Sequence, residues 1–306
     1  MARIVSLIAS ATEIIHALGF GEQIVGRSHE CDYPASVKAL PSVTAPKFRI
    51  DGTSYDIDQR VKEILSEALS VYRVDAEQLA SLRPTHIVTQ TQCEVCAVSL
   101  KDVEAAASCF VSSRPAIVSL SPHSLADIMD DIVRVAAGLG APGKGKALVD
   151  ALTKSMAELE ARARALRDCP SVACIEWIDP LMSAGNWMPE LVEKANGRNL
   201  FGVAGHHSPG LTVAELVAAD PEVIIVSPCG FDIERTLSEL PAFKDQLGGA
   251  GLRAVSEGRL FVADGNQFFN RPGPRLVESL EILTEILHPA EFDFGHRGSG
   301  WVQLSL

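Results

Sequence analysis

A repeated pattern of a helix end, a proline and a short buried strand constrains the fold of this chain more than any other feature. The pattern occurs at Leu79–Gln90 in the first half of the chain and again at Leu216–Ser227 in the second half. Short Val/Ile-rich runs alternate with helical stretches, which is typical of a parallel sheet covered by helices. The expected strands are Ile4–Ile8, Ile24–Arg27, His86–Thr89, Ala116–Ser119, Val172–Trp177, Val223–Ser227 and Leu260–Ala263. The sequence therefore predicts an α/β fold with two lobes of similar plan.

The longest uninterrupted helical run, Lys144–Arg167, separates these two lobes. It is rich in Ala, Leu, Glu, Lys and Arg, and its apolar residues recur at spacings of three and four. We interpret it as a long backbone helix that joins two Rossmann-like parallel-sheet lobes, with a ligand cleft between the lobes outside the carboxyl ends of the strands. The expected division of the chain is 1–123 for the N-terminal lobe, 124–168 for a helical connector and 169–306 for the C-terminal lobe.

The composition excludes several classes of partner. The net charge is −12, and no cluster of Lys and Arg that would bind nucleic acid occurs. No uninterrupted apolar run approaches the roughly 18 residues of a membrane span. Met1 leads directly into the first expected strand, with no secretory leader before it, so we expect a cytoplasmic protein.

A glycine-rich stretch imitates a phosphate-binding loop. Gly138–Gly143 matches G-x-G-x-x-G, and Gly140–Lys146 nearly matches a Walker A loop. Both motifs need a preceding buried strand, whereas residues 128–139 have the period of a helix. Ala147 also replaces the Ser or Thr that would hold magnesium. The sequence therefore predicts a connection between two helices here.

Soft metal ligands follow the ends of several expected strands. Because parallel strands place their carboxyl ends at one edge of each sheet, such residues can converge on one cleft. Thiolate and imidazole groups suit zinc, iron or cobalt better than magnesium or calcium. The candidate metal contacts are His29, Cys31, Cys93, Cys96 and Cys229. Thiol redox chemistry and plain buried packing are the alternatives for these cysteines, and the odd total of seven cysteines favours reduced thiols over a disulfide framework.

Aromatic residues and a carboxylate also cluster at expected loop mouths. Glu176 and Trp177 close one strand, Trp187 precedes a Met-Pro-Glu sequence, and Phe268 and Phe269 follow the last strand. Large planar ligands are commonly held by apolar and aromatic walls with a few polar anchors. We therefore expect these five residues to contact a ligand.

Two further features leave their interpretation open. His206 and His207 lie in a loop flanked by glycine and proline, and either contact a ligand or metal at the cleft rim or are simply solvated. No G-x-S-x-G or comparable elbow marks a catalytic nucleophile, so we do not expect an enzyme.

Several segments, taken in order, resemble a known family: the substrate-binding proteins of ABC importers for cobalamin and iron-siderophores, whose two lobes are bridged by a long backbone helix. The resemblance covers nearly the whole chain. The segments that carry it are Arg3–Glu13, Val25–Ser28, Cys31–Pro34, Arg83–Val88, Pro180–Gly185, Asp220–Ile225 and Asn270–Leu276.

The resemblance implies capture of a ligand in the cleft, with cobalamin or another corrinoid as the closest analogue. The additional contacts that it implies are Ala9, Ser10, Tyr33, Gln90 and Asn270. A zinc- or iron-binding protein with Cys and His ligands and a thiol-dependent enzyme are the alternative functions. An ABC permease and a second copy of the chain are both open as partners. The absence of a leader and the extra cysteines indicate a cytoplasmic branch of the family.

Overall fold

The computed structural model describes residues 2–66, 71–91, 103–104, 114–247, 249 and 251–304, which fall into two compact units. Unit 1 consists of Met1–Gly52, Asp56–Pro122 and Ala126–Ala151. Unit 2 consists of Thr53–Tyr55, His123–Leu125 and Leu152–Leu306. The boundaries that we drew from the sequence at 123/124 and 168/169 stay predictions.

Unit 1 is built on a parallel sheet whose strands lie in the order β2-β1-β5-β6. Its elements are β1 (Ile4–Ser6), α1 (Ala9–Ala17), η1 (Gly21–Gln23), β2 (Ile24–Arg27), η2 (Ala35–Ala39), β3 (Thr44–Pro46), α2 (Ser54–Ser66), β4 (Tyr72–Val74), α3 (Ala76–Leu82), β5 (His86–Gln90), β6 (Ala116–Leu120) and α5 (Leu125–Gly138). Strands β3 and β4 form a separate antiparallel pair. Val5 and Ile87 are paired across β1 and β5 and pack with Leu79 of α3 in the core.

Unit 2 is built on a six-stranded sheet in which β12, β11, β10, β7 and β8 follow one another, with β9 also paired to β7. Its elements are β7 (Ser171–Trp177), β8 (Met182–Ser183), α7 (Met188–Lys194), β9 (Arg198–Asn199), α8 (Val213–Ala219), β10 (Val223–Val226), α9 (Ile233–Leu247), α10 (Arg253–Ser256), β11 (Leu260–Ala263), η3 (Gly265–Phe269), α11 (Leu276–Leu287) and β12 (Trp301–Gln303). The pairs β7–β10 and β10–β11 are parallel, whereas β8 and β12 are antiparallel additions. The predicted α/β class is confirmed; the sheet of unit 1 is parallel, and the sheet of unit 2 is parallel except for β8 and β12.

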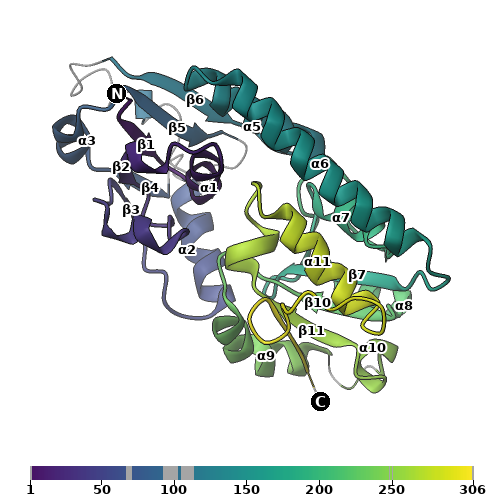
Figure 1. Cartoon of the computed structure of the whole chain (residues 1–306). Helices are drawn as coiled ribbons and strands as arrows, with labels where there is room; N and C mark the ends of the chain where they lie inside the picture. The colour runs from purple at the N-terminus through teal and green to yellow at the C-terminus, as the bar shows by residue number, and fades with distance from the viewer. Residues whose placement is uncertain are drawn as a thin grey trace. The chain divides into compact units, whose positions relative to one another are not determined.

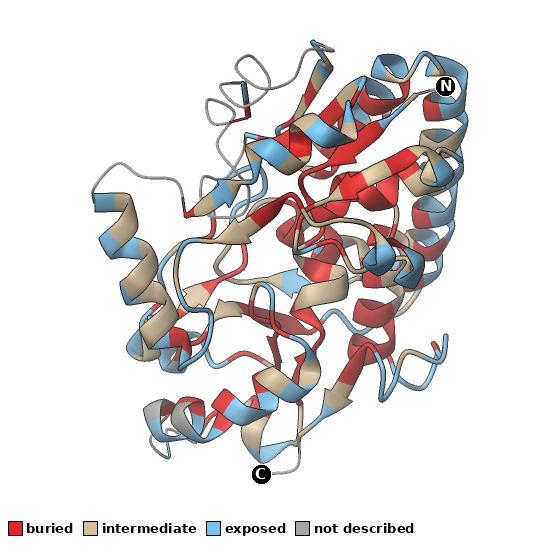
Figure 2. Cartoon of the chain, turned by 90° about the vertical axis from the view of Figure 1, so that its left-hand side faces the viewer, coloured by how far each residue is buried: buried red, intermediate tan, exposed pale blue. Residues whose placement is uncertain are grey.

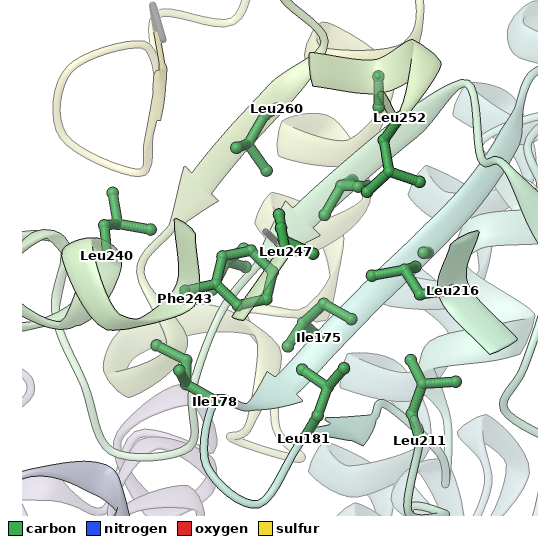
Figure 3. Close-up of a cluster of buried hydrophobic side chains, with 14 of the residues drawn as sticks. Ile175, Ile178, Leu181, Leu211, Leu216, Leu240, Phe243, Leu247, Leu252 and Leu260 are labelled. Atoms are coloured by element: carbon green, nitrogen blue, oxygen red, sulfur yellow. The ribbon is translucent and has the colours of Figure 1, made fainter. Parts of the chain in front are cut away.

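Alternate residues of the unit 2 strands bury one face of the sheet under helices α8, α9 and α10. Ile175, Ile224 and Val262 lie in this core. Figure 3 shows Phe243 of α9 directed at the sheet beside Leu247, and both side chains are buried. Figure 1 shows α7 and α11 on the side of this sheet opposite to α9 and α10. In Figure 2 the buried residues accordingly concentrate in the strands and on the inner sides of the helices.

The predicted long helix is present as α6 (Pro142–Arg164), and the division between the two units falls inside it, after Ala151. The glycine-rich stretch before it connects α5 to α6, as the sequence predicts. Gly140 has a φ of +74° in this connection, and Ala141 N–H donates to Ala136 O at 2.8 Å. No phosphate-binding loop is formed there, because a helix and not a strand precedes the glycines.

Two helices begin on residues that belong to unit 2. Ser54, the first residue of α2, donates its backbone N–H and its hydroxyl to Oε2 of the buried Glu239, at 3.1 and 3.0 Å. Leu125, the first residue of α5, donates its N–H to Oε2 of Glu190 at 2.8 Å. Because the first N–H groups of a helix have no partner within the helix, each carboxylate supplies an acceptor that the helix itself lacks.

Asp131 on α5 makes the stability of unit 1 depend on pH. This carboxyl is buried, accepts a hydrogen bond from Ser121 N–H at 3.0 Å and pairs with Arg134. Burial raises the pKa of Asp131 to about 6, against the opposing effect of Arg134. Because the folded chain then binds this proton more tightly than the unfolded chain does, the stabilisation is complete below about pH 4 and is lost as the pH rises towards 6.

We therefore expect the free energy of unfolding of the wild type, relative to Asp131→Asn, to fall by about 2 kcal/mol between pH 4 and pH 7. Urea unfolding of both proteins across this range measures the difference. A difference that stays constant over the range would contradict the prediction.

Candidate functional site

The carboxyl ends of β7, β10 and β11 carry most of the predicted ligand contacts of unit 2. We call this set of strand ends, together with the turn 184–187 and the loop 205–208, the unit 2 edge. Its segments are joined by backbone hydrogen bonds: Cys229 N–H donates to Glu176 O at 3.1 Å, and Asn266 N–H donates to Phe231 O at 3.0 Å. The parallel register of the three strands therefore brings together residues that are up to 90 positions apart.

Glu176 lies at the centre of the polar contacts of this edge. Its Oε2 accepts a hydrogen bond from Ser208 Oγ at 2.8 Å, and Ser208 Oγ in turn accepts from Gly185 N–H at 3.1 Å. Burial raises the pKa of the Glu176 carboxyl, while the Ser208 hydroxyl and the nearby His207 imidazole oppose that shift. The sequence indicated Glu176, but not Ser208, whose role depends on a contact 32 residues away.

Trp177 and Phe231 form an aromatic pair at the same edge. Their ring centroids are 5.3 Å apart at a tilt of 54°, and the Trp177 Nε1–H donates to Asp179 O at 3.1 Å. Phe231 is buried, whereas Trp177 is partly exposed. An apolar ring whose polar end is already satisfied is suited to contact a large ligand.

The turn η3 after β11 is fixed by Asp264 and Asn270. Asp264 Oδ1 accepts from the N–H groups of Asn266 and Gln267, at 3.0 and 2.8 Å. Asn270 Nδ2 donates to Ser227 O at 3.1 Å and to Gly265 O at 3.0 Å, which ties this turn to the end of β10. Asn270 therefore lies at the unit 2 edge as predicted, with its amide nitrogen already engaged by the backbone.

Trp187 and Phe269 are more buried than their loop positions suggested. Trp187 Nε1–H donates to Phe269 O at 3.0 Å, and both side chains are buried. This buried hydrogen bond joins the start of α7 to η3. Their direct contact with a ligand stays a prediction.

The Phe268 ring contacts two residues that the sequence analysis did not list as ligand contacts. The guanidinium of Arg275 lies 5.2 Å from the Phe268 ring centroid, and the His296 ring meets Phe268 edge-on at 6.1 Å. His296 Nε2 is 2.9 Å from Glu281 Oε2. The proline-rich sequence around Arg275 offered a signal, whereas the chain gave none for His296, which lies 28 residues beyond Phe268.

The corresponding strand ends of unit 1 hold the remaining predicted ligand contacts. Ala9 and Ser10 are buried in the first turn of α1, directly after β1. Gln90 is buried at the end of β5, and Tyr33 is 43% exposed in the loop after β2. Of these four residues, Tyr33 offers the largest accessible side chain.

The candidate metal contacts do not form a cluster within the described residues, where no group of three or more His, Cys, Asp or Glu side chains could hold an ion. His29 Nδ1 is 2.8 Å from Thr44 Oγ1, and its Nε2 is 2.9 Å from Glu30 Oε1. Cys31 is buried, with its Sγ 3.0 Å from Thr12 Oγ1. Cys93 and Cys96 lie outside the described residues, so direct metal binding by these thiols stays a prediction.

Two thiols of unit 2, Cys174 and Cys229, differ in exposure. Burial, with the charge of Glu176 as a smaller contribution, raises the pKa of Cys174 to about 12, so this thiol stays protonated in neutral solution. Cys229 is partly exposed in the loop after β10. Of these two thiols, only Cys229 is accessible at the unit 2 edge.

Comparison with curated proteins finds distant relatives that span most of the chain. An uncharacterized ABC transporter substrate-binding lipoprotein of Bacillus subtilis is 21% identical over 299 residues, which cover 95% of this chain and 81% of the relative. A vitamin B12-binding protein of Vibrio vulnificus is 22% identical over 291 residues, which cover 92% of this chain and 89% of the relative. Within the described part of the chain, no helix is both long enough and apolar enough to cross a membrane.

Solved structures share the fold over nearly the full length. A periplasmic heme-binding protein of Pseudomonas aeruginosa has a TM-score of 0.73 at 21% identity and covers 100% of this chain and 98% of its own. A periplasmic vitamin B12-binding protein of Vibrio cholerae has a TM-score of 0.66 at 19% identity, with coverages of 94% and 97%. A family model described as periplasmic binding protein matches residues 4–266, and the chain therefore belongs to the periplasmic binding protein family.

Proposed function

We propose that this chain is the substrate-binding component of an ABC import system and that its ligand is a corrinoid. Relatives that match the chain over most of its length include a vitamin B12-binding protein and a substrate-binding lipoprotein of an ABC transporter. Fold neighbours include heme-binding proteins, so the broader ligand class is a metal-bearing tetrapyrrole. The family relationship also supports a role in binding and not in catalysis.

The observation that carries the proposal is the aromatic pair at the unit 2 edge. Trp177 is partly exposed, and its ring lies 5.3 Å from the ring of the buried Phe231, centroid to centroid. Polar groups lie at the same edge, because Glu176 precedes Trp177 in β7 and its carboxyl accepts a hydrogen bond from the Ser208 hydroxyl at 2.8 Å. A corrinoid has a broad apolar ring face surrounded by amide groups, and it needs this combination of an aromatic surface and polar partners.

A titration of the purified full chain with cyanocobalamin tests the proposal. We expect saturable binding with a stoichiometry of one. Quenching of tryptophan fluorescence monitors this binding, because the corrinoid absorbs where indole emits. Hemin and an iron-siderophore complex are titrated in parallel. Saturation by hemin or the siderophore alone would keep the transport role and overturn the corrinoid assignment, and no binding of any of the three would overturn both.

The Trp177 side chain gives the titration a residue-level prediction. We expect Trp177→Leu to weaken cyanocobalamin binding about tenfold, because the ligand loses its aromatic contact. Trp177→Phe keeps an aromatic ring at the same place and serves as the matched control, with a loss of less than about threefold. Equal losses in the two variants, measured by isothermal titration calorimetry, would show that the aromatic surface does not contact the ligand.

The cytoplasmic location that the sequence analysis expects is a separate prediction, and it competes with the import role, because the substrate-binding component of an importer captures its ligand outside the cytoplasm. Fractionation of cells that express the native gene tests it. Recovery of the protein in the periplasmic or membrane fraction would contradict the cytoplasmic location and agree with the import role.

A further inference from the structure

The turn η3 is contacted near both of its ends by the segment that follows α11. We call residues 293–300 the C-terminal loop; they lie beyond residue 266, where the match to the family model ends. At the start of η3, Asp264 N–H donates to Gly300 O at 2.9 Å. Near its other end, the Phe268 ring lies 6.1 Å from the ring of His296, centroid to centroid, and the two planes are inclined at 68°. The C-terminal loop therefore contacts the turn that carries Phe268, one of the predicted ligand contacts.

Two carboxylates of α11 fix the C-terminal loop in turn. Glu281 Oε2 lies 2.9 Å from His296 Nε2, and because an ionised carboxylate can only accept, the Nε2–H of the imidazole is the donor. The buried Glu285 accepts from the backbone N–H groups of His296, at 3.3 Å, and of Phe294. His296 is therefore bound to α11 through both its backbone and its side chain, which gives its ring a defined orientation.

The Phe268 side chain depends on ring contacts for its orientation. It has no polar atom that a hydrogen bond could fix, so its rotamer is determined by the groups that pack against the ring. The guanidinium of the buried Arg275 lies 5.2 Å from the ring centroid, seven residues along the chain. His296 reaches the same ring from 28 residues away. The C-terminal loop thus adds a constraint that the local sequence does not supply, while the ring itself is only partly buried.

We propose that His296 is a positioning residue for ligand binding, which holds the Phe268 ring in the orientation that contacts the ligand. This inference rests on the proposed function, because it takes Phe268 to be a ligand contact. A side chain that already has its bound orientation loses less conformational freedom when the ligand arrives, and the affinity is higher as a result. His296 acts in this way through Phe268 and needs no contact with the ligand itself.

Amide hydrogen exchange of the ligand-free chain tests whether His296 orders η3. Phe268 N–H donates to Asp264 O at 3.3 Å, so its exchange reports on the opening of this turn. We expect His296→Ala to speed this exchange about fivefold, because η3 loses its ring contact with the C-terminal loop. Arg297→Ala is the matched control, since the Arg297 guanidinium lies 5.5 Å from the ring of Trp301, which belongs to β12 and not to η3. Exchange that is unchanged in His296→Ala, or equally fast in Arg297→Ala, would overturn the ordering of η3 by His296.

A double-mutant cycle in cyanocobalamin titrations tests whether the effect on binding passes through Phe268. We expect His296→Ala to weaken binding about fivefold and Phe268→Ala to weaken it about tenfold. In the double variant we expect no loss beyond that of Phe268→Ala, whereas a general loss of stability would add to it. His296→Phe keeps an aromatic ring beside Phe268 and should bind within about twofold of the wild type. If hemin or the iron-siderophore alone saturates the wild-type chain, the same cycle is measured with that ligand.

The outcomes separate this inference from the proposed function. Additive losses in the double variant, or a Phe268→Ala chain that binds as tightly as the wild type, would overturn the positioning role and leave the proposed function intact. A loss in His296→Phe as large as that in His296→Ala would do the same. Failure of the wild-type chain to bind cyanocobalamin, hemin and the iron-siderophore would overturn the proposed function, and the role of His296 in binding with it.

Discussion

Replacing Glu285 with alanine is expected to lower the free energy of unfolding by about 4 kcal/mol. Glu285 on α11 is buried, and its two oxygens accept from three donors of the C-terminal segment. Oε1 accepts from the N–H groups of Phe294 and His296, and Oε2 accepts from Trp301 Nε1–H at 2.6 Å. The substitution leaves these donors without an acceptor in the interior, and each unsatisfied group costs about 1–3 kcal/mol.

Removal of the Glu285 carboxylate should also weaken the pairing of β12 with β11, because Trp301 pairs with Ala263 of β11. Urea unfolding measures the stability, and amide hydrogen exchange reports on β12. Glu285→Gln retains one acceptor oxygen and is expected to lose about 2 kcal/mol. Glu291→Ala removes an exposed carboxylate four positions after the helix end and serves as the control, with a change below about 0.5 kcal/mol. A loss of less than about 1 kcal/mol in Glu285→Ala would contradict the role of this carboxylate.

Gly265→Ala is expected to cost about 3 kcal/mol of stability and to weaken ligand binding as well. A Cβ atom at this position would lie 2.1 Å from Pro228 O and 2.7 Å from both the carbonyl carbon and the oxygen of Ser227. These are backbone atoms at the end of β10 and not the far end of a flexible side chain, so the two strand ends must move apart. The hydrogen bonds from Asn270 to Ser227 O and Gly265 O join the same two segments and would be disturbed with them.

Gly143→Ala provides the matched control for that substitution. Gly143 lies in the first turn of α6, and a Cβ atom there would meet no other atom within 4 Å. Alanine is the better helix former, so we expect this variant to be unchanged or about 0.5 kcal/mol more stable. Thermal unfolding and cyanocobalamin titration of both variants check the comparison. A Gly265→Ala protein as stable as Gly143→Ala would show that the strand ends accommodate the added methyl group.

The strand bounds were predicted best where the apolar run in the sequence begins and ends with the strand itself. Ile24–Arg27 and Leu260–Ala263 have the bounds that their apolar runs indicate. The run that begins at Ile4 continues to Ile8, but β1 ends at Ser6 because the next residues turn into α1 at Ala9. Burial is continuous through that turn, so apolar character could not mark the end of the strand.

Short strands that exist only through distant pairing escaped prediction. β12 has three residues, and its sequence, Trp301–Gln303, is too short to have a period. It forms because β11 offers an edge and because the indole of Trp301 reaches Glu285. The same reason applies to β8 and β9, which have two residues each. Local propensity carries no information about partners that lie far along the chain.

The candidate site was predicted by position and not by side-chain direction. Glu176, Trp177 and Cys229 lie at one edge of the sheet, where the strand-end rule expects them, and their contact with a ligand stays a prediction. The rule cannot tell that the Trp187 indole donates to Phe269 O, 82 residues away, and is buried as a result. It also cannot tell that Cys31 lies against Thr12 in the interior. Contacts of this kind depend on the packing of the whole unit.

The placement of Ser54 and Leu125 has a consequence for any attempt to produce unit 2 separately. A polypeptide that starts at Leu152 would contain the whole sheet of unit 2, yet it would lack both of these residues. The buried Glu239 would then lose the two donors of its Oε2, with only Arg235 left on Oε1, and the half-buried Glu190 would lose one donor; a buried acceptor without its donors is costly. Three separate stretches of the gene thus encode unit 2. No single cut of the open reading frame gives a fragment that holds the complete unit 2 with Trp177 and His207 and nothing of unit 1.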